Sequence, residues 1–166
     1  GENVLLDGGS YSYNTTPELV RYFSGTESHN TVMIGDNDQM MKGPRFVWMF
    51  PPTILCADAL ETDHEYVISG QIVAFKHMGK NIAIKREIRK KKGVHEWCVS
   101  DCVQNCPIED ARQLWHSVSS NVVFKSSSGT IQTEEAFYSS YYGKKESCTK
   151  TVFIFNNEIK TKITIR

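Results

Sequence analysis

The sequence predicts an all-β fold, a large antiparallel two-sheet β-sandwich of jelly-roll or supersandwich type with very little helix. Three observations predict it. Apolar and polar residues alternate with a period of two along much of the chain, the connections between these runs are rich in turn-forming residues, and only one short stretch has a helical pattern. Many strands with almost no helix are typical of two sheets packed face to face.

One short helix is predicted near the N-terminus. Thr16 is followed by Pro17 and Glu18, which combines a helix-capping side chain, a proline suited to the first helical position and an acidic residue in the first turn. Segment 19–23 adds apolar residues. The pattern predicts a helix of one or two turns that begins at Pro17.

The strand pattern is clearest in residues 81–91. Ile82, Ile84 and Ile88 fall on one face of this run and charged residues fall on the other, as expected of a half-buried strand. Further strands are predicted at residues 32–34, 53–61, 66–75, 94–103, 114–117, 121–125 and 137–142. Turn-forming residues connect them in segments 35–38, 77–80, 92–93 and 126–129.

The C-terminal end carries two more alternating runs, residues 151–155 and 159–165. They flank Asn156 and Asn157, which favour tight turns. The pattern predicts a hairpin in which these two strands pair with each other. No repeat of 20–50 residues is visible, which argues against a propeller or a solenoid.

Length and composition predict a single domain, residues 1–166. Seven Tyr, eight Phe and three Trp supply enough apolar surface for a core and exclude a disordered chain. No apolar run approaches the roughly 18 residues of a membrane-spanning helix. The 19 basic residues are balanced by 19 acidic ones, which argues against nucleic acid as a partner. Because the chain begins at Gly1 rather than Met, we expect it to be a piece of a longer protein.

Five histidines are present, and none forms an H-x-H or H-x-x-x-H pair. Zinc sites and cupin-type metal sites use such pairs, so we expect no metal and no cofactor, and a metal-dependent jelly-roll enzyme is the least favoured function. Cys98, Cys102 and Cys106 are spaced four residues apart and are expected on one face of a strand. We interpret them as buried free thiols rather than as a zinc site or a nucleophile.

The most basic segment is 85–92, which holds six basic residues and one Glu. Such a segment attracts anionic polymers, so Lys85 and Arg86 are candidate contacts for an acidic polysaccharide. The alternative is a solvated strand edge whose charges discourage edge-to-edge pairing.

Segment 21–39 is the richest in candidate site residues. It has a loop of Ser, Gly and Thr residues and then the pair His29–Asn30, directly before a predicted strand, and such loops often carry binding sites. Imidazole and carboxamide groups can bind a sugar carboxylate, and His29 can also move a proton near neutral pH. His116, in a predicted strand, is a candidate for the core or for a cleft.

Several short motifs follow one another in a defined order. They are LLDGGSYSYN, RYF-x3-ESHNTV, Asp38-Gln39, Arg45-Phe46-x-Trp48, Lys85-Arg86, Trp97-x3-Asp101 and Gln113-Leu114-Trp115-His116. In this order they resemble the C-terminal β-sandwich domain of the heparinase II/III-type polysaccharide lyases. The resemblance extends from about residue 5 to about residue 124, and the S-H-N-T-V box is its most specific part.

The resemblance implies a lyase in which a helical toroid precedes the sandwich and the substrate cleft lies between the two. The implied reaction is β-elimination at a uronic acid, in which the carboxylate is neutralised, the C5 proton is abstracted and the 4-linked oxygen leaves. The histidine of the H-N-T box falls on His29, the catalytic candidate. The substrate-binding candidates are Asn30, Arg21, Lys85, Arg86 and His116.

The tyrosine acid/base of these lyases belongs to the helical domain and is outside this chain. The expected partners are therefore an acidic polysaccharide and an N-terminal helical domain of the same protein. The expected compartment is the periplasm or the cell exterior, with the cytoplasm left open.

One position departs from the family pattern. Family members with a zinc in the sandwich have a second His two residues after the one matching His29, whereas this chain has Thr31, so we expect no zinc at His29. Two function classes are then compared. One is the C-terminal part of a lyase, and the other is a non-catalytic glycan-binding or structural β-sandwich module. An upstream toroid with a tyrosine in the cleft would distinguish them.

Overall fold

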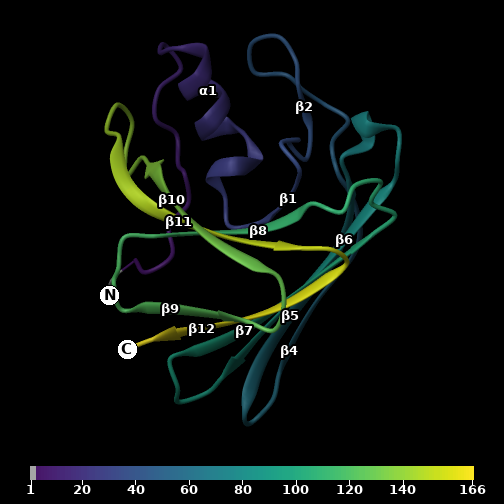
Figure 1. The fold of residues 1–166 in the computed structure, drawn as a ribbon, viewed down its shortest axis with the longest axis vertical. Coiled ribbons are helices and arrows are strands. Elements are labelled where there is room, and N and C mark those ends of the chain that lie inside the picture. The colour runs from purple at the N-terminus through teal and green to yellow at the C-terminus, as the bar shows by residue number, and fades with distance from the viewer. Residues whose placement is uncertain (1–2) are drawn as a thin grey trace.

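The computed structural model describes residues 3–166 and confirms the antiparallel two-sheet β-sandwich (Figure 1). Strands make up 52% of the structure and helices 9%. A six-stranded sheet packs against a four-stranded sheet, and a small two-stranded sheet lies apart from both. No helix in the described range is long and apolar enough to cross a membrane.

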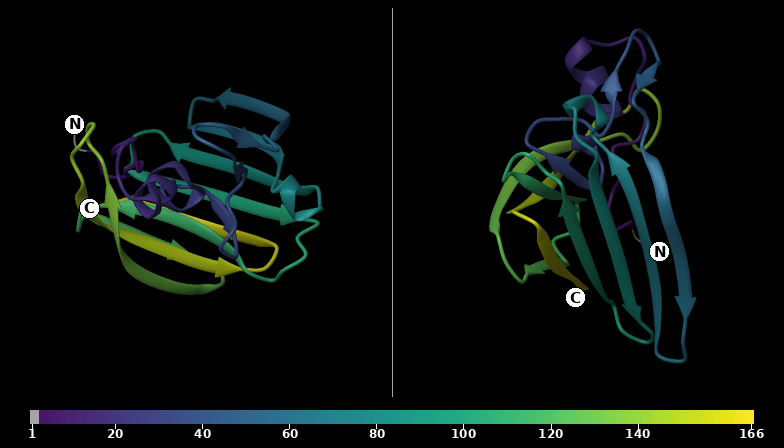
Figure 2. Two further views of the ribbon diagram at one scale, coloured as in Figure 1. Left: turned by 90° about the horizontal axis from the view of Figure 1, so that it is seen from above. Right: turned by 90° about the vertical axis from the view of Figure 1, so that its right-hand side faces the viewer.

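The six-stranded sheet contains four strands, β4 to β7, that are neighbours both in the sequence and in the sheet. In spatial order it is β4 (Thr53–Glu61), β5 (Glu65–Ala74), β6 (Ile82–Lys91), β7 (Glu96–Gln104), β12 (Glu158–Ile165) and β9 (Val122–Ser126). All neighbouring pairs are antiparallel. Figure 2 shows β4 at the outer edge of this long, twisted sheet.

The four-stranded sheet is covered on its outer face by the N-terminal helical segments, α1 (Pro17–Ser24) and η1 (Thr26–Ser28). In spatial order it is β1 (Val32–Ile34), β8 (Ala111–Ser117), β11 (Glu146–Phe155) and β10 (Thr130–Tyr138). The remaining elements are β2 (Met41–Lys42), β3 (Trp48–Met49) and η2 (Lys76–Met78). Figure 1 shows α1 above β10 and β11.

The main core lies between the two sheets. Ile82 and Ile84 of β6 belong to the same buried cluster as Trp115 of β8 and as Phe153 and Phe155 of β11. Because successive side chains of a strand point to opposite faces, every second residue of these strands enters the core. The period-two alternation in the sequence therefore reflects which side chains enter the core between the two sheets.

The predicted helix is confirmed as α1, with Pro17 at its first turn. Thr16 occupies the N-cap position with extended backbone angles, φ −64° and ψ 148°, but its side chain makes no capping hydrogen bond. Tyr22 attaches the helix to the sheet, because its hydroxyl donates to the carbonyl of Phe137 at 2.9 Å and accepts from the Phe137 amide at 3.0 Å.

A chain of buried polar groups crosses the core between the sheets. Asp101 of β7 accepts two hydrogen bonds from Arg86 of β6, from Nε to Oδ1 and from Nη2 to Oδ2, both 2.7 Å. Asp101 Oδ2 also accepts a hydrogen bond from Gln113 Nε2 of β8 at 2.8 Å. The Asp101 side chain has no exposed surface. A carboxylate in such a place needs these partners, because burying an unpaired charge is very unfavourable.

The same chain continues to the loop before β1. Gln113 Oε1 accepts hydrogen bonds from Trp115 Nε1 at 2.8 Å and from Thr161 Oγ1 at 2.5 Å. Arg86 donates its remaining Nη1 to the backbone carbonyl of Asn30 at 2.6 Å. The core therefore holds the loop that carries the His29–Asn30 pair.

The predicted C-terminal hairpin is wrong. β11 pairs with β8 and β10 in the four-stranded sheet, whereas β12 pairs with β7 and β9 in the six-stranded sheet. The Asn156–Asn157 turn therefore carries the chain from one sheet to the other. Alternation and turn residues predict two strands and a reversal of direction, but they do not predict which other strands each of them pairs with.

Two further expectations need correction. The strand predicted at residues 137–142 is β10, which begins at Thr130 and ends at Tyr138. Its first six residues are all exposed, so they lack the alternation that would have revealed them. The three cysteines do not share one face. Cys98 and Cys102 lie on the outer face of β7, whereas Cys106 follows the strand and packs against the core. Asn105, with φ 60°, breaks the strand between them.

The Arg86–Asp101 pair yields a prediction about stability. Asp101→Ala leaves the Arg86 guanidinium and the Gln113 amide without their acceptor, and we expect a loss of about 3–5 kcal/mol in the free energy of unfolding. Denaturant unfolding measures this loss. Asp63→Ala, in the exposed turn between β4 and β5, is the matched control and should change the free energy by less than about 0.5 kcal/mol. A small loss for Asp101→Ala would contradict a structural role of the pair.

Candidate functional site

His29 lies where η1 ends and β1 is about to begin, on the outer side of the four-stranded sheet. Its Nδ1 is 2.7 Å from Oδ2 of Asp7, and 38% of its side chain is exposed. Within residues 3–166 no hydrogen bond engages Nε2. A carboxylate on Nδ1 favours the tautomer with the proton on that nitrogen, which leaves the Nε2 lone pair available at the surface.

Asp7 reaches His29 because two glycines allow the N-terminal segment to pass close to its neighbours. Gly8 donates its amide to the Ser28 carbonyl at 2.9 Å, and a Cβ on Gly8 would stand 2.5 Å from the Ser28 side chain. Gly9 has φ 68°, in the left-handed region that favours glycine. Neither position accepts a larger residue without moving the backbone that carries Asp7.

The carboxyl of Asp7 is held in its charged form. Partial burial would raise its pKa, but the hydrogen bonds from His29 and from the Gly9 amide, together with the charge of His29, lower the pKa below its ordinary value. Asp7 is therefore an anion at neutral pH. An anion here orients the imidazole of His29.

Asn30 ties the His29 loop to β8 and to the N-terminal segment. Its Oδ1 accepts a hydrogen bond from the His116 amide at 2.7 Å and lies 3.2 Å from His116 Nδ1. Its Nδ2 donates to the Leu6 carbonyl at 2.9 Å. Oxygen and nitrogen of the carboxamide are both engaged inside the protein, so Asn30 positions its neighbours, and one N–H of its half-buried Nδ2 group is left for a ligand.

His116 lies behind His29 and is 1% exposed. Burial lowers its pKa to about 4, and the positive charges of Lys150 and His29 act in the same direction. Its ring is therefore neutral at pH 7. Nδ1 faces Asn30 Oδ1, whereas Nε2 is buried and has no hydrogen-bond partner in the described part of the chain. The structure brings His29, Asn30 and His116 together; His29 and Asn30 are half-buried, whereas His116 is buried.

The other three predicted substrate contacts lie elsewhere. Arg86 is between the sheets, and its donors are engaged by Asp101 and by the Asn30 carbonyl. Lys85 is on the outer face of the six-stranded sheet, on the far side of the sandwich. Arg21 is on α1 and lines a pocket beneath that helix. Of the three, only Arg21 is on the same side of the sandwich as His29.

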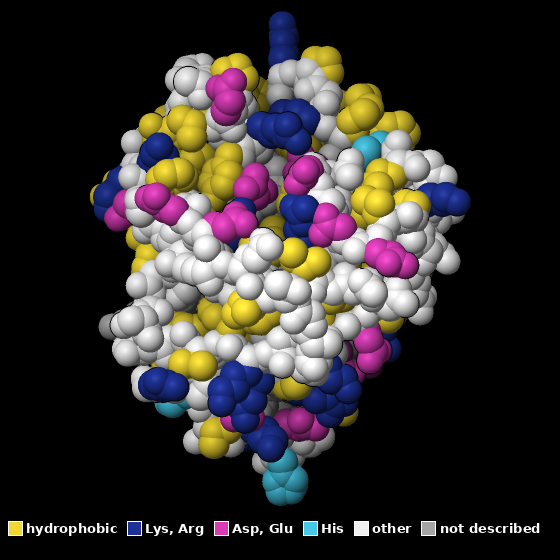
Figure 3. All heavy atoms as spheres, viewed as in Figure 1, with side chains coloured by type: hydrophobic (Ala, Val, Ile, Leu, Met, Phe, Trp, Pro, Cys, Tyr) yellow, Lys and Arg dark blue, Asp and Glu magenta, His cyan; other side chains and the backbone are white. Residues whose placement is uncertain are grey.

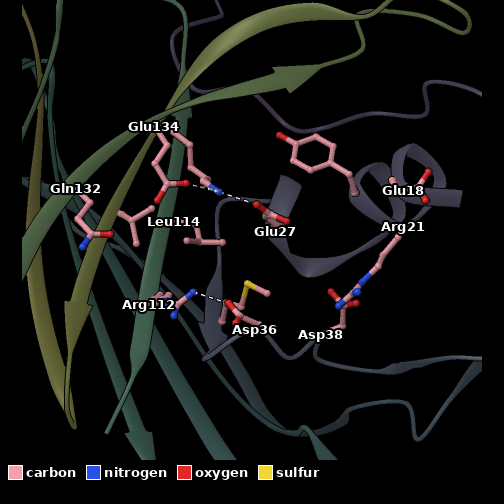
Figure 4. Close-up of a pocket in the computed structure, with 13 residues that line it drawn as sticks. Glu18, Arg21, Glu27, Asp36, Asp38, Arg112, Leu114, Gln132 and Glu134 are labelled. Atoms are coloured by element: carbon pink, nitrogen blue, oxygen red, sulfur yellow. Dashed lines mark hydrogen bonds and ion pairs between the residues drawn. The ribbon is translucent and has the colours of Figure 1, made fainter. Parts of the chain in front are cut away.

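The pocket beneath α1 continues from His116 along the outer face of the four-stranded sheet. It has a volume of about 440 Å³. Its lining residues come from α1, η1, the segment after β1, and strands β1, β8, β10 and β11, and they are Glu18, Arg21, Tyr22, Glu27, Met33, Asp36, Asp38, Arg112, Leu114, Gln132, Glu134, Lys150 and Val152. Figure 4 shows these side chains converging from the sheet and from the helix.

Lys150 is the central cation of the pocket. It pairs with His116 in the β8–β11 register, and its Nζ is 2.7 Å from Glu27 and 3.0 Å from Glu134 (Figure 4). Burial would lower its pKa, but the hydrogen bonds and charges of the two glutamates raise the pKa above its ordinary value. At the far end, Arg112 is paired with Asp36 and Asp110. The pocket thus has charged groups at both ends, and Met33, Leu114 and Val152 add an apolar part to its lining.

The arrangement can bind and move protons on an anionic, hydroxyl-rich ligand. His29 Nε2 offers a proton donor or acceptor at the surface, and the pocket holds charged side chains from α1, η1 and the four-stranded sheet. No group of three or more His, Cys, Asp or Glu residues with metal-binding geometry occurs within residues 3–166.

Sequence reasoning found His29 and missed its partner Asp7. The two are 22 residues apart in the chain, and no local spacing connects them. Lys150, Glu27 and Glu134 were missed for the same reason, since they meet only after β11 is placed between β8 and β10. For Asp7, the Gly8–Gly9 pair that follows it is the one signal in the sequence, because it marks a segment that approaches other backbone closely.

A family model described as "Heparinase II/III-like, C-terminal" matches residues 1–166, the whole chain. No curated protein sequence matches the chain.

Solved structures with the same fold include a heparinase III, the BT4657 gene product, with a TM-score of 0.76 and 14% sequence identity. Heparan sulfate lyase HepC from Pedobacter heparinus has a TM-score of 0.75 and 14% identity. In both comparisons the match covers 99% of this chain and 28% of the other. The chain therefore spans about a quarter of the length of these proteins, and at this identity the likeness shows the fold alone.

The buried, neutral His116 predicts how stability depends on pH. Its folded pKa of about 4 is below the ordinary value of 6.5, so between these values the unfolded chain binds a proton that the folded chain does not. The free energy of unfolding should therefore fall as the pH falls from 7 to 4.5, with about 2–3 kcal/mol of the loss due to His116.

Denaturant unfolding at the two pH values, compared with the variant His116→Gln, measures this contribution. The variant should lose less stability than the wild type over the same interval. His64→Gln, at an exposed turn, is the control and should keep the wild-type pH dependence. Equal pH dependence in wild type and His116→Gln would show that His116 is not the group that titrates.

Proposed function

The chain belongs to the heparinase II/III-like C-terminal family, and from that premise we propose that it is the β-sandwich part of a polysaccharide lyase. The proposed reaction is β-elimination on a polysaccharide that contains uronic acid. The proposed substrate cleft runs past His29 and along the pocket beneath α1. Arg21, which lines that pocket, and Asn30, next to His29, are the proposed substrate contacts on this side of the sandwich.

The observation that carries the proposal is the Asp7–His29 pair. An imidazole whose Nδ1 is bound to a carboxylate at 2.7 Å, with its other nitrogen free at the surface, is an oriented proton carrier. Asn30 and the buried His116 support it from behind, and Arg86 fixes the loop backbone. A surface histidine without a function would not require this set of partners.

In the proposed reaction, a base removes the C5 proton of the uronate, the C4–C5 double bond forms and the bond from C4 to the glycosidic oxygen breaks. The leaving oxygen takes a proton from an acid. The C5 proton becomes acidic enough when the carboxylate is neutralised, since negative charge develops on that group. His29, oriented by Asp7, contacts the carboxylate or relays the proton through Nε2.

The second acid/base group is proposed to come from an N-terminal helical domain of the same protein. The chain spans 28% of the lyases that share its fold, which leaves room for such a domain in the full-length protein. A secreted or periplasmic location agrees with a polysaccharide substrate and is proposed on that ground.

The isolated chain should have no lyase activity. β-Elimination needs a base at C5 and an acid at the leaving oxygen, both within hydrogen-bond reach of the sugar, and one of the two is proposed to belong to the N-terminal helical domain. Ultraviolet absorbance of the unsaturated uronate product measures the reaction. Product formed by the 166-residue chain from any uronate polymer would contradict the two-domain cleft.

In the full-length protein, His29→Ala should reduce kcat by about 10²–10³ while the fold is kept, because one charge-stabilising donor is lost. Asp7→Asn keeps a hydrogen-bonding group and removes the charge, so we expect a smaller loss of kcat and a shifted pH profile. His64→Ala, a histidine at the exposed β4–β5 turn, is the matched control and should retain full activity.

Thermal unfolding of the same samples separates catalysis from stability. If His29 only ties the loop to the strand, His29→Ala lowers the melting temperature and keeps wild-type turnover at temperatures where it is folded. That outcome would remove His29 from the mechanism.

A further inference from the structure

The outer face of the six-stranded sheet, opposite to His29, carries a groove along β7. Its floor consists of the small side chains Cys98, Ser100 and Cys102. Longer charged side chains of β6 and β12 form the two walls, and the hollow has a volume of about 300 Å³. The centre of a sheet face is more often filled by large side chains, so the small residues create the depression.

The register shows how charge is arranged along the groove. Three rows cross β6, β7 and β12 in that order, and they are Lys85–Cys102–Glu158, Glu87–Ser100–Lys160 and Arg89–Cys98–Lys162. Every row contains at least one cation. Since outward-facing residues of a strand are two positions apart, neighbouring rows are separated by about 7 Å.

The face carries a small excess of cations. Its outward cations are Lys85, Arg89 and Lys91 of β6, Lys160 and Lys162 of β12, and Lys125 of β9, against the acids Asp58 of β4, Glu65 of β5, Glu87 of β6, Glu96 of β7 and Glu158 of β12. Figure 3 shows Lys and Arg side chains gathered at the lower end of the molecule, where the β4–β5 and β6–β7 hairpins end in Figure 1.

Lys85 and Lys160 are the free cations of the groove. Arg89 is paired with Glu87 and Glu65, and Lys162 is paired with Glu96, whereas no ion pair engages Lys85 or Lys160 within residues 3–166. The hydrogen bond from Arg89 and the charges of Arg89, Lys85 and Lys160 hold the pKa of Glu87 below its ordinary value. The cations of both walls therefore favour the charged form of Glu87, which is itself part of the β6 wall.

We propose that this groove is a second polysaccharide-binding surface, which holds an acidic segment of the polymer remote from the His29 cleft. The surface rests on the proposed function, because that function supplies the polymer. A linear polymer with repeated carboxylate or sulfate groups matches a straight groove with cations repeated along it. Binding here keeps the enzyme on the chain between cleavage events.

Charge complementarity favours this occupant over the alternative of a solvated face. A merely solvated face needs no depression and no free cations on both walls. Lys85 and Lys160 stand on opposite walls in neighbouring rows, so both can contact one polymer that lies between them.

The test uses dextran sulfate, an acidic polysaccharide without uronic acid, which a uronate β-elimination cannot cleave. The full-length protein is treated with a thiol-alkylating reagent with and without the polymer, and the rate at each cysteine is measured by mass spectrometry. Cys98 and Cys102 on the groove floor should be protected, whereas the exposed Cys56 of β4 should react at its original rate. Uncharged dextran should protect none of them.

Lys85→Gln/Lys160→Gln should raise the polymer concentration for half-protection about three- to tenfold, as expected for the loss of two exposed ionic contacts. Lys80→Gln/Lys145→Gln removes the same charge from positions away from the groove and should leave the concentration unchanged. Equal protection in both double variants, protection that extends to Cys56, or no protection at all would overturn the proposal.

The outcome is separable from that of the lyase proposal. Turnover of a short uronate oligosaccharide, too short to reach the far face, should be the same in wild type and Lys85→Gln/Lys160→Gln. If His29→Ala keeps wild-type turnover, the proposed role of His29 is wrong. The protection of Cys98 and Cys102 is measured independently of turnover and is not affected by that result.

Discussion

The buried pair Arg86–Asp101 is the constraint on which the rest of the structure depends. A carboxylate with no exposed surface needs its partners in place, and here they come from two strands, β6 and β8. Arg86 aligns β6 with β7, Gln113 joins them to the opposite sheet, and the third guanidinium nitrogen holds the Asn30 carbonyl. The same guanidinium therefore takes part in the packing of the core and fixes the position of the His29 loop.

The two outer faces of the sandwich differ in how far they are covered by other elements. The outer face of the four-stranded sheet is covered by α1 and η1, which close a charged pocket, and His29 is partly exposed at the end of η1. The outer face of the six-stranded sheet has no cover in the described chain and shows its charges directly to solvent. Lys85 and Arg86, adjacent in sequence, therefore belong to different environments, one on the open face and one in the core.

Much of the fold was predictable from the sequence because the alternation reports the core interface directly, as in Ile82 and Ile84 of β6. The assignment of strands to sheets was not predictable, because a turn such as Asn156–Asn157 can connect two strands of one hairpin or two strands in different sheets. His29 was predictable from its local motif, whereas Asp7 depends on a contact across 22 residues. Arg86 was misjudged on charge alone, although its place between Ile84 and Ile88 on the inward face indicates a core residue.

The most direct test is a structure of the full-length protein with an uncleaved uronate oligosaccharide bound. If the sandwich supplies a group to the reaction, we expect His29 Nε2 within about 3 Å of the uronate carboxylate or of a proton-carrying group at the scissile bond. We also expect the Asp7–His29 contact and the Arg86–Asp101 pair to be intact in that complex. An oligosaccharide bound productively with no atom in reach of His29 would contradict the assignment of the cleft to this face of the sandwich.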